Sequence, residues 1–140
     1  MAISLNHTIV VARDKEKAAG FLTGILGLPP HLRVGHFAVV RVGETSLDFV
    51  ETDAPIEQRH FAFLVSEAEF DAIFQRIRDR RMPYWADPFR REPNAVNTYD
   101  DGRGVYFEDP DGHLLEILTR SYGSGGPDAK NPNPLFYPKR

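Results

Sequence analysis

The sequence predicts an α+β fold of two βαβββ modules, whose strands form a cupped mixed sheet with the helices on its outer face. Two observations predict it: the order strand, helix and hairpin occurs twice, and 140 residues with 41% hydrophobic side chains suit one domain built from both copies. We expect modules at residues 1–53 and 54–122, followed by a flexible C-terminal arm at 123–140. In each module the helix covers only one face of the half-sheet. The copies are therefore expected to pair, within the chain or in a homodimer, and to enclose a cavity.

The first module begins with a strand over residues 3–12, which are rich in β-branched and apolar side chains. A helix is predicted over 14–26, because apolar residues recur there at helical spacing and Gly27 follows as a stop. Residues 36–42 and 45–51 flank a short turn and indicate a hairpin.

The second module repeats this order. Residues 60–65 predict a strand, and Ser66 with Glu69 forms an S-x-x-E capping box that opens an amphipathic helix. The segments 104–108 and 113–119 flank the turn sequence Asp-Pro-Asp-Gly and indicate the second hairpin.

Composition excludes several classes of function. Seventeen basic and twenty acidic residues give a formal charge of -3, which lacks the basic excess of proteins that bind nucleic acid or membrane surfaces. No apolar run has the length of a membrane helix, and the N-terminus does not resemble a signal peptide, so a cytoplasmic location is expected. Because the chain has no cysteine, metal ligands must come from His, Asp and Glu.

Three side chains are the candidate ligands of one divalent metal ion: His7, His60 and Glu116. The two histidines occupy corresponding places near the start of the first strand of each module. Glu116 stands in the apolar run Leu-Leu-Glu-Ile-Leu, where a carboxylate is costly unless it is paired or bound to a metal. Two histidines and one carboxylate suit Fe, Mn, Co, Ni or Zn and leave coordination positions open for chemistry, so Glu116 is also a candidate catalytic residue.

Two further residues have alternative interpretations. Asp48 is the positional counterpart of Glu116 in the first module. It is interpreted either as a fourth metal ligand or as an exposed carboxylate at a sheet edge. Tyr106 is the second candidate catalytic residue, because its hydroxyl could donate a hydrogen bond to a metal-bound substrate. The alternative is that Tyr106 only packs in the sheet, as other aromatic residues do. His113 follows a turn on the strand face opposite Glu116, and we expect it at the surface.

Two segments outside the repeats are candidates for covering a cavity. Residues 87–103 are polar and rich in turn formers, which is typical of a functional lid. The arm that begins at residue 123 is rich in Gly, Pro and Asn and ends with the apolar group Leu135-Phe136-Tyr137. This group is an anchor for a partner subunit or for the cavity, or the arm is simply disordered.

Residues 3–120 resemble the vicinal oxygen chelate superfamily, which includes glyoxalase I, fosfomycin-resistance thiol transferases, extradiol dioxygenases and bleomycin-resistance proteins. The resemblance is carried by Leu5-Asn6-His7-Thr8, by Arg59-His60-Phe61-Ala62-Phe63, and by the stretch from Val105 to Glu116, which contains Asp109-Pro110-Asp111-Gly112. It implies two βαβββ modules that are commonly exchanged in a dimer. It also implies that the positions of His7, His60 and Glu116 are metal ligands, with His7 of one subunit sharing the ion with His60 and Glu116 of the other.

The sequence departs from individual members of that superfamily. Extradiol dioxygenases have a tyrosine at the position of Tyr106 but also a histidine several residues upstream, where this chain has Asn97, Thr98 and Tyr99. The fosfomycin enzymes use a threonine at the position of Ile9 and a lysine in the lid, whereas this chain has no lysine in residues 18–129. Glyoxalase I supplies a fourth carboxylate at the position of Asp48.

The resemblance implies a metal-dependent enzyme that acts on a small substrate chelating the ion through oxygens, with dioxygenase-like chemistry favoured. A glyoxalase-type lyase or isomerase is one alternative. The other is a metal-free protein that sequesters a small molecule such as a drug in a cavity lined by aromatics, among them Trp85 and Phe89. Since all three ligand positions are filled, the enzyme is favoured over the binding protein.

Overall fold

The computed structural model describes residues 2–138, which form two compact units. Residues 2–58 and 109–112 make the first unit, and residues 59–108 and 113–138 make the second; each is described by itself. Both contain a four-stranded mixed sheet and one α-helix, which confirms the predicted α+β fold of two βαβββ modules.

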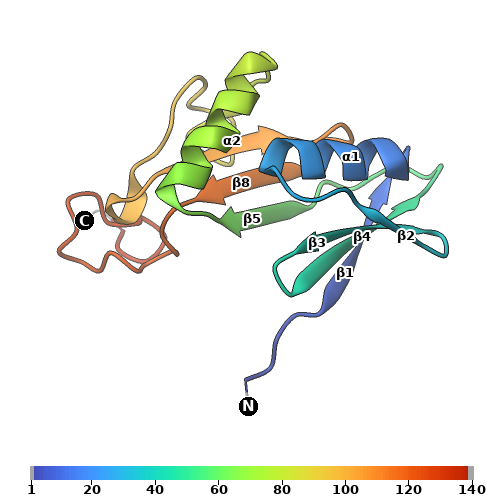
Figure 1. Cartoon of the computed structure of the whole chain (residues 1–140). Coiled ribbons are helices and arrows are strands. Elements are labelled where there is room, and N and C mark those ends of the chain that lie inside the picture. The colour runs from blue at the N-terminus through green and yellow to red at the C-terminus, as the bar shows by residue number, and fades with distance from the viewer. Residues whose placement is uncertain (1, 139–140) are drawn as a thin grey trace. The chain divides into compact units, whose positions relative to one another are not determined.

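The first unit has strand order β1-β4-β3-β2, with β1 parallel to β4 and the other pairs antiparallel. Helix α1 packs on β1, β3 and β4 (Figure 1). The elements are β1 (His7–Ala12), α1 (Lys15–Leu26), β2 (Leu32–Val34), β3 (Phe37–Val42) and β4 (Thr45–Glu51).

Alternation along β1 decides which side chains face the helix. Val10 and Ala12 are buried, whereas His7 and Ile9 are exposed on the face that α1 does not cover. The helix begins where the Asp14 side chain accepts a hydrogen bond from the Lys17 amide, and it ends at Gly27, whose φ of 71° is the left-handed conformation that glycine adopts without strain.

The second unit repeats this arrangement, with strand order β5-β8-β7-β6 and β5 parallel to β8. The predicted capping box is confirmed: the Glu69 amide donates to the Ser66 hydroxyl, and the Ser66 amide donates to the Glu69 carboxylate. Helix α2 buries Phe70, Ile73 and Ile77. The elements are β5 (His60–Leu64), α2 (Glu67–Asp79), β6 (Tyr84–Trp85), the 3-10 turn η1 (Tyr99–Asp101), β7 (Gly104–Glu108) and β8 (Leu114–Leu118).

The short edge strands β2 and β6 complete each module, although the sequence did not place either of them. With three and two residues respectively, these strands are too short to show an alternating pattern in the sequence. The predicted boundaries at 53 and 122 stay predictions, and residues 1, 139 and 140 of the predicted modules and arm lie outside the described part. No helix within 2–138 is long and apolar enough to span a bilayer.

Candidate functional site

Strand register places three of the predicted site residues on one face of the second sheet. His60 lies opposite Leu114 in the β5–β8 pair, so Glu116, two residues further along β8, is on the same face. Tyr106 lies directly opposite Glu116 in the β7–β8 pair. The ring of Tyr106 stacks against His60, with 5.9 Å between the ring centroids.

His60 and Glu116 meet through their side chains. Nδ1 of His60 lies 3.0 Å from the carbonyl oxygen of Leu114, and its Nε2 lies 3.1 Å from Oε1 of Glu116. A carbonyl oxygen can only accept, so Nδ1 carries a hydrogen and a neutral ring would turn the Nε2 lone pair towards the carboxylate. The hydrogen bond to Glu116 is the main cause that raises the pKa of His60 above its usual value, against the opposing effect of burial.

The chemistry of this donor pair fits a divalent metal ion. The carboxylate of Glu116 is 1% exposed, and it faces an imidazole nitrogen whose partner nitrogen is fixed by a backbone carbonyl. Metal-ligating histidines typically donate their other N–H to such a carbonyl. In a neutral His60 ring, the Nε2 lone pair and the Glu116 carboxylate repel each other. A positive charge on the ring, or between the ring and the carboxylate, removes this repulsion. A bound cation provides that charge.

The hydroxyl of Tyr122 completes the hydrogen bonding of Glu116 and is itself bonded to the hydroxyl of Tyr106. The hydroxyl of Tyr122 lies 2.8 Å from both carboxylate oxygens, and it lies 2.8 Å from the hydroxyl of Tyr106. Burial is the largest cause that raises the pKa of both phenols, that of Tyr122 to about 12. Both phenols are therefore neutral at physiological pH and can donate hydrogen bonds.

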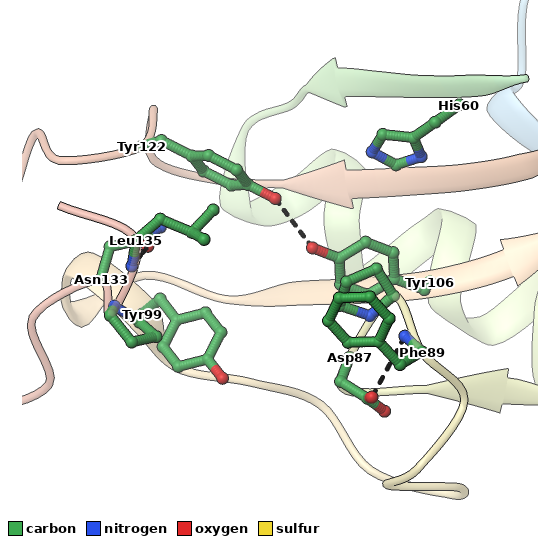
Figure 2. A pocket seen from close by; sticks show the side chains of 10 residues that line it. His60, Asp87, Phe89, Tyr99, Tyr106, Tyr122, Asn133 and Leu135 are labelled. Carbon is green, nitrogen blue, oxygen red and sulfur yellow. Dashed lines mark hydrogen bonds between the residues drawn. The ribbon is translucent and has the colours of Figure 1, made fainter. Parts of the chain in front are cut away.

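A mainly apolar cavity of about 360 Å³ opens beside these residues in the second unit (Figure 2). Figure 2 shows Tyr99, Asn133 and Leu135 on the side towards the C-terminal segment and Tyr106 on the side of the sheet. The cavity is lined by His60, Asp87, Pro88, Phe89, Tyr99, Tyr106, Tyr122, Asn133, Pro134 and Leu135. A second hollow of about 370 Å³ shares His60 and Tyr122 and also reaches Glu116.

The loop 87–103, predicted as a lid, supplies one wall of this cavity. Its first turn is held by Asp87, a buried carboxylate that accepts hydrogen bonds from the amides of Phe89, Arg91 and Glu92. These bonds hold the backbone of the turn that carries Phe89, a lining residue of the cavity whose side chain is otherwise exposed.

The C-terminal segment, residues 121–138, contributes further lining residues, namely Tyr122, Asn133, Pro134 and Leu135. Asp100 accepts from the amides of Gly123 and Gly125, and Asp101 accepts from those of Lys130 and Asn131. These hydrogen bonds connect most of the predicted arm to the second unit, whereas its mobility in solution stays a prediction.

His7 and Asp48 occupy the equivalent register in the first unit. His7 lies opposite Ser46 on β4, and Asp48 is two residues further along, as Glu116 is relative to His60. Their partners differ: Nδ1 of His7 lies 2.7 Å from the Asn6 side-chain oxygen, and the Ser46 hydroxyl donates to Asp48. Within residues 2–138 no three His, Asp or Glu side chains are gathered closely enough to hold a metal ion. The role of His7 as a ligand therefore stays a prediction.

The expectation that His113 lies at the surface is wrong. This residue is 0% exposed, its Nδ1 accepts a hydrogen bond from the Arg59 amide, and its ring meets Phe61 edge-on. It shares a strand face with Leu115 and Ile117, which are also buried. The alternation that placed it opposite Glu116 therefore placed it in the core.

Sequence reasoning missed Tyr122. It lies beyond the last strand, where no periodic pattern indicates the direction of a side chain, and it reaches Glu116 only because the chain turns back there. One of the alternatives for the apolar group at 135–137 was an anchor near the cavity, and Leu135 of this group lines the cavity.

Comparisons with known proteins agree with the fold. A family model described as the Glyoxalase/Bleomycin resistance protein/Dioxygenase superfamily matches residues 4–117. Glutathione transferase FosA of Serratia marcescens is 30% identical over 86% of this chain and 84% of its own. Metallothiol transferase FosB of Shouchella clausii (strain KSM-K16) is 28% identical over 85% and 82%. Among solved structures, Oxidase ChaP-H2 has a TM-score of 0.87 and 54% identity, and the alignment covers 90% of this chain and 100% of that one.

Proposed function

The chain belongs to the glyoxalase/bleomycin resistance protein/dioxygenase superfamily, and we propose that it is a metal-dependent oxidase with dioxygenase-like chemistry on a small substrate that chelates the metal through oxygens. The similar proteins carry the names of enzymes, and this chain is an enzyme as well. The proposal concerns its reaction and its metal.

We assign the metal to His60 and Glu116, with His7 of the same or of another chain as the third ligand. The observation that carries this assignment is the contact of 3.1 Å between Nε2 of His60 and Oε1 of Glu116, with Nδ1 held by Leu114. One divalent ion of the group Fe, Mn, Ni, Co or Zn suits such donors. A homodimer with exchanged modules would bring His7 to the pair.

When bound, the ion supplies Lewis-acid polarisation of substrate oxygens and, where it is redox-active, a route for electrons. The residues of the chain orient the substrate and exclude water. The rings of Tyr106 and Phe89 give the cavity an apolar wall, so a substrate body packs there while its oxygens face His60. The Tyr106 hydroxyl is hydrogen-bonded to Tyr122, and its donation to a substrate stays a prediction.

Oxidase chemistry is supported by the 54% identity with Oxidase ChaP-H2, which extends over the whole of that protein. A glyoxalase-type reaction would use Asp48 as a carboxylate ligand, and the Ser46 hydroxyl already bonds this side chain. A metal-free sequestering protein would leave the repulsion between His60 and Glu116 to be relieved by a proton alone.

Thiol transfer is the second candidate, favoured by the 30% identity with Glutathione transferase FosA. Against it stand two differences noted in the sequence. Ile9 replaces the threonine of the fosfomycin enzymes, and the loop 87–103 carries no lysine. We therefore favour oxidase chemistry over thiol transfer.

The test is an assay of the purified protein loaded with Fe(II), Mn(II), Ni(II) or Zn(II) on a panel of catechols and thiohemiacetals, with and without oxygen. The proposal predicts turnover that requires oxygen, and it predicts that His60→Ala abolishes turnover while His36→Ala, a change at an exposed histidine, does not. Turnover that proceeds equally without oxygen would contradict the oxidase and favour the isomerase.

A further inference from the structure

We propose that Tyr122 is a positioning residue for Glu116, and that the C-terminal segment 121–138 supports the metal site by holding Tyr122 in place. This inference deepens the proposed function, because it rests on Glu116 as a metal ligand. It assigns a role to a residue outside the repeated modules, which the sequence pattern does not indicate.

The segment reaches the site through a fixed path. After β8 the chain turns at Tyr122, and the next residues are held by Asp100, whose carboxylate oxygens accept from the Gly123 and Gly125 amides at 3.0 Å each. Asp100 is 1% exposed and has a φ of 59°, a left-handed conformation that is uncommon for a residue other than glycine. A Cβ on Gly125 would lie 2.7 Å from the Asp100 Cα, which shows how closely the two backbones approach.

The hydrogen bonds between the tyrosines and Glu116 have one direction. Each hydroxyl has a single hydrogen, and an ionised carboxylate can only accept. Tyr122 therefore donates to Glu116, and Tyr106 donates to Tyr122. The reverse direction would place the lone pairs of Tyr122 against the carboxylate at 2.8 Å.

This direction gives Tyr122 a function beyond packing. Its hydroxyl lies 2.8 Å from both oxygens of Glu116, while Oε1 also faces Nε2 of His60, so the two contacts together restrain the orientation of the carboxylate. A ligand carboxylate held in this way loses little rotational freedom when it binds an ion. Loss of hydrogen-bonded partners of this kind typically weakens metal affinity by about 10- to 100-fold.

The test compares Tyr122→Phe with Tyr137→Phe, a change at the other tyrosine of the segment, whose hydroxyl is outside the Tyr106–Tyr122–Glu116 chain. Co(II) affinity is measured by competition with a chelator, and the visible spectrum of the Co(II) protein reports its coordination. We expect Tyr122→Phe to weaken Co(II) binding by about 10- to 100-fold and to change the spectrum, whereas Tyr137→Phe changes neither.

A second variant separates positioning from folding. Asp100→Ala removes the acceptor that holds Gly123 and Gly125 without altering Tyr122 itself, and it is expected to weaken Co(II) binding in the same direction. Circular dichroism of the metal-free proteins confirms that the variants fold. Unchanged Co(II) affinity and spectrum in folded Tyr122→Phe would overturn the inference.

The outcomes also separate this inference from the proposed function. If wild type binds Co(II) through His60 and Tyr122→Phe binds it equally well, the inference fails and the metal site stands. If wild type binds no Co(II), or if His60→Ala binds it as wild type does, the proposed metal site fails and the inference fails with it.

Discussion

The hydroxyl of Tyr122 lies 2.8 Å from both carboxylate oxygens of Glu116 and links the C-terminal segment to strand β8. Glu116 is 1% exposed, and burying its carboxylate without hydrogen-bond partners would cost several kcal/mol of folding free energy. The phenol and the imidazole of His60 are those partners. The carboxylate of Glu116 and the groups that hold it thus come from two strands and from the segment after them.

Replacing Glu116 by Gln should separate metal binding from folding. The amide oxygen still accepts from Tyr122, and the amide N–H can donate to the Nε2 lone pair of His60. The free energy of unfolding of the metal-free protein should therefore change by less than about 1 kcal/mol in urea titrations. Divalent metal affinity should fall at least tenfold.

The control for this variant is Glu44→Gln, in the exposed turn between β3 and β4, which should alter neither quantity. Metal affinity of Glu116→Gln equal to that of wild type would exclude Glu116 as a ligand.

Tyr106→Phe should destabilise the protein modestly. Tyr106 is 3% exposed, and its loss leaves the hydroxyl of Tyr122 without the hydrogen bond that Tyr106 donates. Urea titration should show a decrease of about 1 kcal/mol in the free energy of unfolding. No decrease, or a gain, would mean that the Tyr106–Tyr122 bond contributes nothing to the folded state.

The sequence predicted the modules, both helices and the main strands because their apolar residues repeat at helical or strand spacing. It also named His60, Tyr106 and Glu116 as candidate site residues, and the strand register of the structure places them on one face. It did not predict Tyr122 or the anchoring by Asp100, which depend on the path of an irregular chain. The prediction for His113 was wrong because it rested on the residue's place after a turn, whereas the ring is buried and accepts a hydrogen bond from the Arg59 amide.

Asp100→Ala should release the C-terminal segment. Two hydrogen bonds from the amides of Gly123 and Gly125 are lost, and limited trypsin digestion after Lys130 should become faster than in wild type. The matched control is Asp128→Ala, at an exposed aspartate of the same segment. Equal digestion rates for wild type and Asp100→Ala would show that Asp100 does not hold the segment.

The stability of the protein should depend on Glu16 in acid. The Arg33 guanidinium first, and then His31, hydrogen-bond this carboxylate and lower its pKa from 4.5 to about 2. A carboxylate whose pKa is lower in the folded state stabilises the fold above pH 4.5, and this contribution is lost as the pH falls from 4.5 to about 2.

Unfolding of wild type and Glu16→Gln between pH 6 and pH 2 measures this contribution. The stability difference between them should be constant above about pH 5 and should shrink below it. A difference that does not change with pH would contradict the assignment of the pKa shift to this cluster.

The most direct test of the metal site is a titration of the metal-free protein with Co(II), followed by its visible spectrum, for wild type, His7→Ala, His60→Ala and the control His36→Ala. The account predicts one ion per chain for wild type and the control, and loss of tight binding in both ligand variants. Tight binding that survives in His60→Ala, or wild type that binds no stoichiometric ion, would contradict it.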